Sequence, residues 1–197
     1  MKKKLSILIA VVMTLALFAP SAFAASDLPK DHRFYEEITY LMDKEIVTGY
    51  SNGTVQPDRV VTRAEAAIMI ARLKGFSGAQ QETKFSDVPK GHPASGYIAE
   101  AVKAGLLSGY TDGTYKPDAP IIRGDMAMII KRVFDLGLTG QWEFKDVSSN
   151  MKAYDAVQTM LLGNITIGYP DKTFRPNLKV TRGQFSAFLA RGMEPKF

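Results

Sequence analysis

The sequence predicts an all-α protein made of three copies of one helix–loop–helix unit. Three observations lead to this class. A nine-residue segment recurs at spacings of 60 and 59 residues, turn-forming residues fill it, and apolar residues recur at helical steps of three and four on both sides of it. The recurring segments are Gly49–Pro57, Gly109–Pro117 and Gly168–Pro176. A fixed period of this length indicates one repeated and stacked unit, so any functional site is expected three times.

The first 24 residues have the pattern of a secretory signal peptide. Lys2, Lys3 and Lys4 precede an apolar run of about 15 residues, which is shorter than the roughly 20 residues that span a bilayer. Ala22-Phe23-Ala24 then gives the small-x-small cleavage pattern. We therefore expect export, cleavage after Ala24 and no transmembrane segment in the mature chain.

The composition argues against several functions. Three of the 25 basic residues lie in residues 1–24, which leaves 22 basic against 20 acidic residues and no clustered basic face for nucleic acid. The absence of cysteine excludes disulfides, thiolate metal sites and cysteine nucleophiles. The two histidines, His32 and His92, are too few for a metal cluster and are expected to serve the turn that opens a unit. We expect no cofactor and no metal.

Within each unit, the first helix is predicted by an apolar stripe that faces its neighbours. The three stripes are Ile38, Leu41, Met42 and Ile46; Ile98, Ala101, Val102 and Leu106; and Val157, Met160, Leu161 and Ile165. The second helix carries a similar stripe of core residues: Ala66, Met69, Ile70 and Leu73; Met126, Ile129, Ile130 and Val133; and Phe185, Phe188 and Leu189.

The second helices have recognisable starts. Pro57 and its two copies close the loops and prevent extension of the first helices. Thr62 with Glu65, and Thr181 with Gln184, are predicted capping boxes. The second unit lacks this device, because it has Ile122 at the cap and Asp125 at the third helical position.

Three motifs resemble the S-layer homology (SLH) domain family, which usually occurs as three tandem repeats. They are an opening F-x-D-V (Phe85–Val88 and Phe144–Val147), the loop Gly109–Pro117, and the helix start Thr62-Arg63-Ala64-Glu65. The resemblance covers about residues 26–192. It divides the chain into a signal peptide (1–24) and repeats 25–76, 85–135 and 144–192, within one compact module of residues 25–197.

This resemblance implies a pseudo-threefold, three-pronged module whose first helices form a central three-helix bundle, with grooves between adjacent prongs. It further implies a non-enzymatic protein of the bacterial surface that binds an anionic secondary cell-wall polysaccharide, typically with a ketal-pyruvylated amino sugar. Another surface protein is a further possible partner.

The strongest candidate contacts for such a ligand are Arg63, Arg123 and Arg182. Each is expected in the first turn of a helix, where the macrodipole disfavours a cation. A guanidinium can bind a carboxylate with two parallel hydrogen bonds, and free N–H groups of the same helix end can join it. The alternative is that each arginine pairs with a repeat acid, such as Asp87 or Asp146, and fastens neighbouring units.

The other candidates have two interpretations each. Asp87 and Asp146 can accept sugar hydroxyls or cap a helix. A set of repeated tyrosines can stack on a sugar or pack under the loop, and a set of repeated glycines can permit the turn or form a wall for the ligand. These sets are Tyr50, Tyr110 and Tyr169, and Gly49, Gly109 and Gly168. Because Glu65 is expected to support Arg63, loss of Arg63 is expected to weaken binding most.

Other functions stay open at this point. Unequal repeats favour, as an alternative, a structural or partner-docking surface protein with degenerate glycan sites. A wall-polymer hydrolase is disfavoured, since no nucleophile–base pair is recognisable. A calcium module is disfavoured as well, because the loops lack the alternating oxygen ligands and terminal Glu of an EF-hand.

Overall fold

The computed structural model describes residues 25–137, 140, 144–194 and 196–197, so the expected signal peptide lies outside the described part. The described residues form α-helices and contain no β-strand, which confirms the all-α class. The helices are α1 (Tyr35–Asp43), α2 (Arg63–Leu73), α3 (Ser95–Lys103), α4 (Arg123–Val133), α5 (Tyr154–Leu162) and α6 (Arg182–Met193). None of the described helices is long and apolar enough to cross a membrane.

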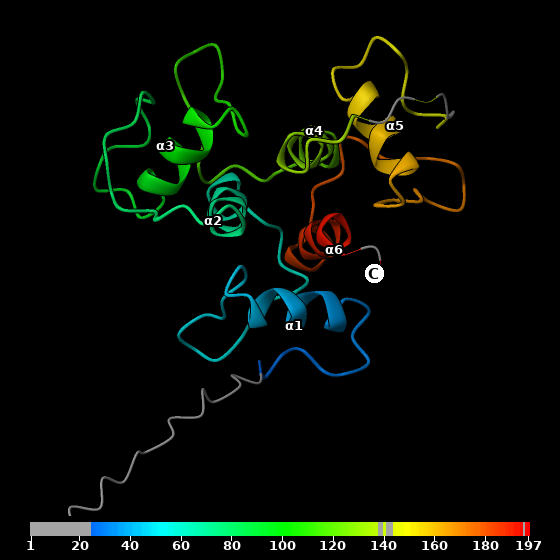
Figure 1. Cartoon of the computed structure of the whole chain (residues 1–197), viewed down its shortest axis with the longest axis horizontal. Helices are drawn as coiled ribbons and strands as arrows, with labels where there is room; N and C mark the ends of the chain where they lie inside the picture. The colour runs from blue at the N-terminus through cyan, green and yellow to red at the C-terminus, as the bar shows by residue number, and fades with distance from the viewer. Residues whose placement is uncertain (1–24, 138–139, 141–143, 195) are drawn as a thin grey trace, which may run out of the picture.

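The second helix of each repeat, and not the first, lies at the centre of the molecule. Figure 1 shows α2, α4 and α6 in the middle, with α1, α3 and α5 around them as three prongs. The expectation of a central bundle of first helices is therefore wrong. The physical reason is burial on several faces: α2 and α4 each bury seven of 11 residues, many of them small, whereas α1 buries three of nine.

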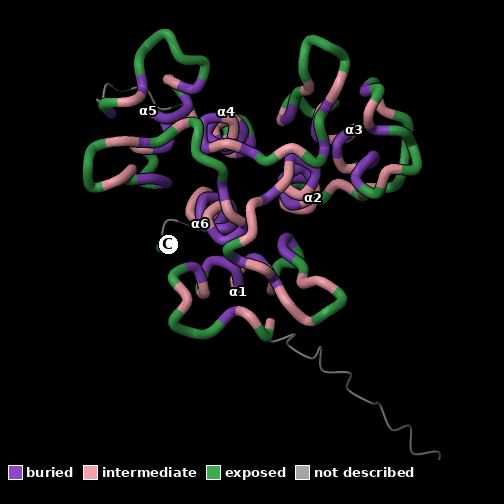
Figure 2. Tube along the Cα trace, turned by 180° about the vertical axis from the view of Figure 1, so that it is seen from behind, coloured by how far each residue is buried: buried purple, intermediate pink, exposed green. Residues whose placement is uncertain are grey.

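Each first helix packs against the second helix of a different repeat. The helix contacts join α1 with α6, α2 with α3, and α4 with α5, and α4 also touches α6. In Figure 2 the facing sides of these helices are buried and the loops at the prong tips are exposed. The two helices of one repeat are thus not a hairpin, because the apolar face of each first helix is covered by a second helix from another repeat.

A closed ring of three backbone hydrogen bonds lies where the repeats meet. Val61 N–H donates to the Val180 carbonyl (2.9 Å), Val180 N–H to the Ile121 carbonyl (3.0 Å), and Ile121 N–H to the Val61 carbonyl (3.1 Å). All three side chains are buried in the core. The ring gives the molecule its pseudo-threefold axis and links the first repeat directly to the third.

The helix ends follow local sequence signals, with one correction. Both predicted capping boxes, Thr62 with Glu65 and Thr181 with Gln184, are present, and α4 starts without a side-chain cap. The last stripe residue of each first helix (Ile46, Leu106 and Ile165) lies beyond the end of that helix. In the first repeat, Ile46 is buried but lies beyond α1. The helix ends earlier because Glu45 adopts a left-handed conformation (φ 58°), after which Ile46 N–H donates back to the Leu41 carbonyl (2.9 Å).

The opening turns use the histidines as expected. The Nδ1 atom of His32 accepts from Phe34 N–H (3.2 Å), and that of His92 accepts from Ala94 N–H (3.1 Å). Each bond fixes the chain at the entry to a first helix. The prediction that both histidines serve this turn is confirmed.

Candidate functional site

The backbone N–H groups at the start of the central helices are already occupied. In α2, Arg63 N–H donates to the Ala119 carbonyl and Ala64 N–H to the Pro117 carbonyl, both at 2.9 Å. Glu65 N–H donates to the Thr62 hydroxyl (3.2 Å). Because the loop of the next repeat and the Thr62 cap use these donors, the expectation that free N–H groups of the helix end assist ligand binding is wrong for α2.

The three repeat arginines are buried and hold the loop of the following repeat. Arg63 donates from Nε to the Tyr115 carbonyl (2.8 Å) and from Nη2 to the Ser108 carbonyl (2.9 Å). Arg182 does the same to the carbonyls of Val55 (2.9 Å) and Thr48 (3.1 Å). The arginines therefore do fasten neighbouring repeats, but through carbonyl groups and not through the repeat aspartates.

Each arginine also lies over a predicted tyrosine of the following repeat. The guanidinium carbon is 5.0 Å from the ring centroid for Arg182 over Tyr50 and for Arg63 over Tyr110, and 5.1 Å for Arg123 over Tyr169. We name the three places after their arginines. The Arg182 site comprises the residue 46–50 loop with the start of α2; the Arg63 and Arg123 sites are its counterparts.

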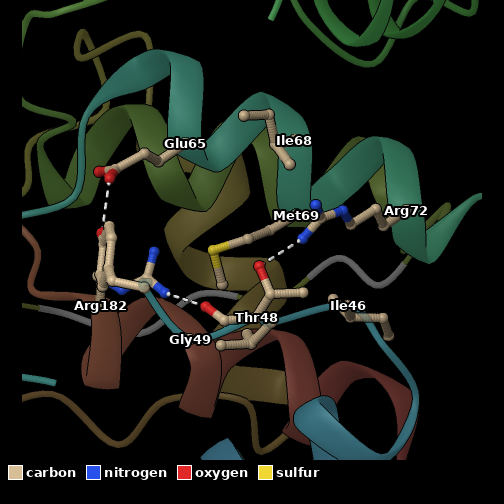
Figure 3. A pocket seen from close by; sticks show the side chains of 10 residues that line it. Ile46, Thr48, Gly49, Glu65, Ile68, Met69, Arg72 and Arg182 are labelled. Carbon is tan, nitrogen blue, oxygen red and sulfur yellow. Dashed lines mark hydrogen bonds between the residues drawn. The ribbon is translucent and has the colours of Figure 1, made fainter. Parts of the chain in front are cut away.

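The Arg182 site contains a cavity of about 180 Å³ between the loop of residues 46–50, α2 and Arg182 of α6. Figure 3 shows Arg182 reaching toward the loop from one side, while Glu65, Ile68, Met69 and Arg72 of α2 form the other side. The lining residues are Ile46, Val47, Thr48, Gly49, Tyr50, Glu65, Ile68, Met69, Arg72 and Arg182. The cavity thus brings together Tyr50, Gly49 and Glu65 of the first repeat with the arginine of the third.

Glu65 belongs to a polar network at the edge of this cavity. Its carboxylate accepts from the Tyr50 hydroxyl (2.9 Å), from the Thr62 N–H (2.9 Å) and from the guanidinium of Arg59, which also donates to the Tyr50 oxygen. Burial works to raise the pKa of Glu65, but these hydrogen bonds outweigh it and hold the pKa below its usual range. Glu65 is therefore ionised at neutral pH and supports the Arg182 site, not Arg63 as expected.

The remaining charges make the cavity a net positive one. Arg72 donates from Nη1 to the Thr48 hydroxyl (3.1 Å), and Arg182 lies opposite it. Burial lowers the pKa of Arg182, while Tyr50 and Glu65 act in the opposite direction. With Glu65 neutralised by Arg59, two guanidinium groups face a partly apolar hollow, and such an arrangement favours a small anion.

The three sites differ at the positions around the arginine. The Arg182 site has Thr48, Arg59 and Glu65; the Arg63 site has Ser108, Ala119 and Asp125; the Arg123 site has Ile167, Leu178 and Gln184. Ile167 is 84% exposed and Leu178 43% exposed. The Arg123 site therefore replaces the charged network by aliphatic side chains and an amide.

The repeat aspartates hold their own loops. The Asp87 carboxylate accepts from the N–H groups of Tyr115 (2.8 Å) and Lys116 (2.7 Å), and Asp146 accepts from Phe174 (2.8 Å) and Arg175 (2.7 Å). Neither caps a helix. Both oxygens of each carboxylate are committed to backbone groups, which makes these residues supports of the loops that carry the tyrosines.

Two of the predicted glycines are required by close packing. A Cβ on Gly109 would lie 2.2 Å from the Phe85 ring, and one on Gly168 would lie 2.3 Å from the Phe144 ring. Gly168 also has a positive φ of 71°. Gly49 lines the Arg182 cavity directly.

Three polar residues of the Arg182 site were missed from the sequence. Arg72 could have been found from its repetition, because Arg132 and Arg191 stand at the same spacings of 60 and 59 residues. Thr48 gave no recognisable motif, and Arg59 has no charged counterpart in the other repeats, which carry Ala119 and Leu178 there. The only available signal for Arg59 was this departure from the repeat. Across the described part of the chain, no group of three metal-ligating side chains comes together.

Comparison with known proteins gives three matches within the chain to one family, described as the S-layer homology domain, at residues 26–67, 84–127 and 143–186. Among curated relatives, a cell surface glycoprotein 1 of Acetivibrio thermocellus is 36% identical over 162 residues, which are 74% of this chain and 7% of that protein. A cellulosome-anchoring protein of the same organism is 30% identical over 156 residues (74% and 35%). An endoglucanase of Bacillus sp. strain KSM-635 is 31% identical over 207 residues (96% and 22%). The chain thus spans about a third or less of the length of these relatives.

Proposed function

Because this chain belongs to the S-layer homology domain family, we propose that it attaches non-covalently to the bacterial cell wall by binding an anionic wall polysaccharide. The observation that carries the proposal is the Arg182 cavity, where Arg182 and Arg72 face a hollow with a tyrosine at its wall. One relative is itself a cellulosome-anchoring protein, which supports attachment as the role of the shared region.

The chemical class of the ligand follows from the two guanidinium groups. Each presents planar N–H donors that match a carboxylate, and the aromatic ring of Tyr50 suits the apolar face of a sugar. A sugar that carries a carboxylate, such as a ketal-pyruvylated amino sugar, combines both features. We assign the Arg182 site as the principal place for it, with the Arg63 site second, because both retain an acid beside the arginine.

Catalysis is not part of the proposal. The endoglucanase relative is matched over only 22% of its length, so the similarity gives no ground for transferring its activity. The charged groups that line the Arg182 cavity are two cations and one carboxylate, and the carboxylate is bound by Arg59, Tyr50 and a backbone N–H. Such a carboxylate is stabilised in its ionised form and is a poor general acid.

The first test is co-sedimentation of residues 25–197 with purified cell walls before and after chemical removal of the secondary polymer. We expect binding to intact walls and its loss on stripped walls. Equal binding to both would refute the polysaccharide as ligand. It would instead favour the partner-docking alternative, for which the exposed Ile167 and Leu178 of the Arg123 site are the supporting observation.

The second test locates the site. Arg72→Ala removes a cation of the Arg182 cavity without removing a bond to the backbone, and Arg132→Ala is its matched control at the Arg63 site. Losing a charge-assisted hydrogen bond to a carboxylate costs about 1.5–3 kcal/mol, so calorimetric titration with pyruvylated wall fragments should show a roughly ten- to hundredfold weaker Kd for Arg72→Ala. A larger loss in Arg132→Ala would move the principal site to Arg63.

A further inference from the structure

The charges of this chain are distributed unevenly among its repeats. The third repeat (residues 144–192) contains seven basic and three acidic residues, whereas the first (residues 25–76) contains seven basic and eight acidic residues. The third repeat also carries two of the exposed large apolar side chains, Ile167 at 84% and Leu178 at 43%. An apolar surface and a surplus of positive charge therefore occur together in the third repeat.

The exposed side chains of this region belong to one connected surface, which we call the third-repeat patch. Lys145 N–H donates to the Lys172 carbonyl (3.0 Å), and Leu178 N–H donates to the Arg175 carbonyl (3.0 Å). The Arg175 guanidinium lies 3.9 Å from the centroid of the Tyr169 ring and forms an ion pair with Asp171 (3.1 Å). The patch consists of Lys145, Ile167, Lys172, Arg175, Leu178 and Lys179.

The third-repeat patch has the composition of a protein-binding surface. Its three lysines are exposed and form no ion pair within the described part of the chain. The residues that correspond to Ile167 and Leu178 are polar, charged or small: Thr48 and Arg59 in the first repeat, and Ser108 and Ala119 in the second. Two aliphatic side chains with a charged rim suit a partner that offers an apolar hollow bordered by carboxylates.

The first repeat provides a surface of this kind on the outer side of α1. A cavity of about 350 Å³ is lined by Glu36, Thr39, Tyr40, Asp43, Lys196 and Phe197, and we call it the α1 pocket. The Tyr40 and Phe197 rings, with centroids 5.0 Å apart, form its apolar part. Glu36 and Asp43 are exposed and unpaired among the described residues, so two free carboxylates face the single ammonium group of Lys196.

We propose that the third-repeat patch of one molecule docks on the α1 pocket of a second copy of this chain. The aliphatic side chains of the patch meet the two aromatic rings of the pocket, and the lysines of the patch face Glu36 and Asp43. Figure 1 shows α1 and α5 in different prongs, so the two surfaces lie on different parts of the molecule. Because the two surfaces differ, the contact repeats head to tail and builds chains or rings of molecules.

This inference concerns contacts between copies and does not depend on the polysaccharide. Neighbouring copies on a wall would also hold one another, which strengthens attachment through multivalency without a new wall contact. Because the contact is tested in solution without any wall polymer, it can fail while the proposed function stands.

The first test is sedimentation velocity of residues 25–197 at rising protein concentration, in about 0.05 M and 0.5 M salt. We expect association with a Kd in the micromolar to millimolar range, as for other small interfaces, and a weaker association at high salt. Ile167→Ser/Leu178→Ala installs the residues of the second repeat and should weaken the Kd about tenfold or more. A parent that stays monomeric at millimolar concentration and low salt overturns the proposal.

The second test reverses the charge of each surface in turn. Lys172→Glu/Lys179→Glu makes the patch acidic, and Glu36→Lys/Asp43→Lys makes the pocket basic. Each variant alone brings like charges together and should be monomeric. In an equimolar mixture every contact pairs opposite charges, so the two variants should assemble in alternation with about the affinity of the parent.

The matched control is Lys90→Glu/Lys103→Glu, which reverses two exposed lysines of the second repeat and should associate like the parent. Circular dichroism checks that every variant keeps its helices. Variants that associate like the parent when alone, a mixture that stays monomeric, or an equal loss in the control each overturn the assignment of these two surfaces.

Discussion

The arginines and aspartates that recur in the repeats form hydrogen bonds with the backbone of the protein itself. The guanidinium of Arg63 donates to two carbonyls of the next repeat. The Asp87 carboxylate accepts from two N–H groups of the loop between α3 and α4. Since unpaired buried polar groups are destabilising, alanine at either position would disturb the fold as well as any ligand. Tests of binding therefore belong at residues such as Arg72, which hold no backbone group.

The carboxylates predict an acid-sensitive fold. The pKa of Glu65 and that of Asp87 both lie below their usual range, because hydrogen bonds to the ionised form outweigh the effect of burial. A lowered folded-state pKa contributes stability that is present above the unfolded pKa and is lost as the pH falls through the folded one. Urea unfolding should give similar free energies at pH 7 and pH 5 and a clearly smaller one at about pH 3.

The control for this pH dependence is Asp87→Asn. The amide cannot ionise, so the variant should be less stable than the parent at pH 7 and should lose less stability on acidification. A parent that is equally stable at pH 3 and pH 7 would show that the carboxylate bonds contribute nothing.

Arg59 gives the Arg182 site its distinctive charge balance. The Arg59→Ala variant leaves Glu65 without its cation, so the carboxylate competes with an anionic ligand for Arg182. Since Arg59 is 37% exposed at its side chain, we expect an effect of about 1 kcal/mol or less on the free energy of unfolding. We expect a roughly fivefold weaker Kd for the anionic fragment.

The double variant Arg59→Ala/Glu65→Gln separates charge from structure. Removal of both charges should restore much of the affinity for the anionic fragment, whereas a purely structural role of Arg59 predicts no recovery. Asp125→Asn, at the corresponding place beside Arg63, is the matched control and should leave the Arg182 site unaffected.

At the level of the helices, the two helices that pack together belong to different sequence repeats. The central helix of one repeat packs on the first helix of the next, as α2 does on α3, and α6 packs on α1 to close the series. Contacts such as the ion pair of Arg191 with Glu37 (3.1 Å), 154 residues apart, hold this last pair. A cut between repeats therefore separates helices that pack together.

Two fragments of similar length should behave differently. Residues 25–78 are one sequence repeat but contain neither partner of their two helices, and residues 59–119 contain α2, α3 and the loop that Arg63 holds. We expect 25–78 to be largely unfolded and 59–119 to show more helix by far-UV circular dichroism, since short helices depend on packing. Higher helicity in 25–78 would contradict the pairing.

The sequence could predict the elements but not their partners. Periodicity shows which face of a helix is apolar, and local motifs such as Thr62 with Glu65 show where the helix begins. Neither signal says what covers that face. The same limit applied to the site. Arg182 and Tyr50 were identifiable from their repetition. Glu65 was assigned to Arg63 because the two residues are close in sequence, but in the structure Glu65 belongs to the Arg182 site.

At the level of the whole molecule, the three repeats share one core around the backbone ring. Ile121 contributes to this ring and is 1% exposed. Ile121→Ala should lower the free energy of unfolding by about 2–5 kcal/mol, as for other large-to-small changes in a core. Ile167→Ala, at an 84% exposed isoleucine, is the control and should change it by less than about 0.5 kcal/mol.

The number of steps in the unfolding transition is as informative as the free energy of unfolding. Because every repeat contacts both others through the ring, the Ile121→Ala variant should still unfold in one step, with circular dichroism and tyrosine fluorescence changing together. Separate transitions of the two signals would show that a repeat can unfold independently.

The backbone ring also limits how such a protein can change in number of repeats during evolution. An open stack of repeats can gain a copy at any junction, since each copy contacts only its neighbours. Here the backbone hydrogen bonds form a closed cycle through Val61, Ile121 and Val180, and α6 packs against α1. A fourth copy inserted by duplication would find no free donor or acceptor in that cycle and would leave α1 facing the wrong helix. Three is therefore the number this architecture preserves, and an increase in binding sites would have to come from duplicating the whole module.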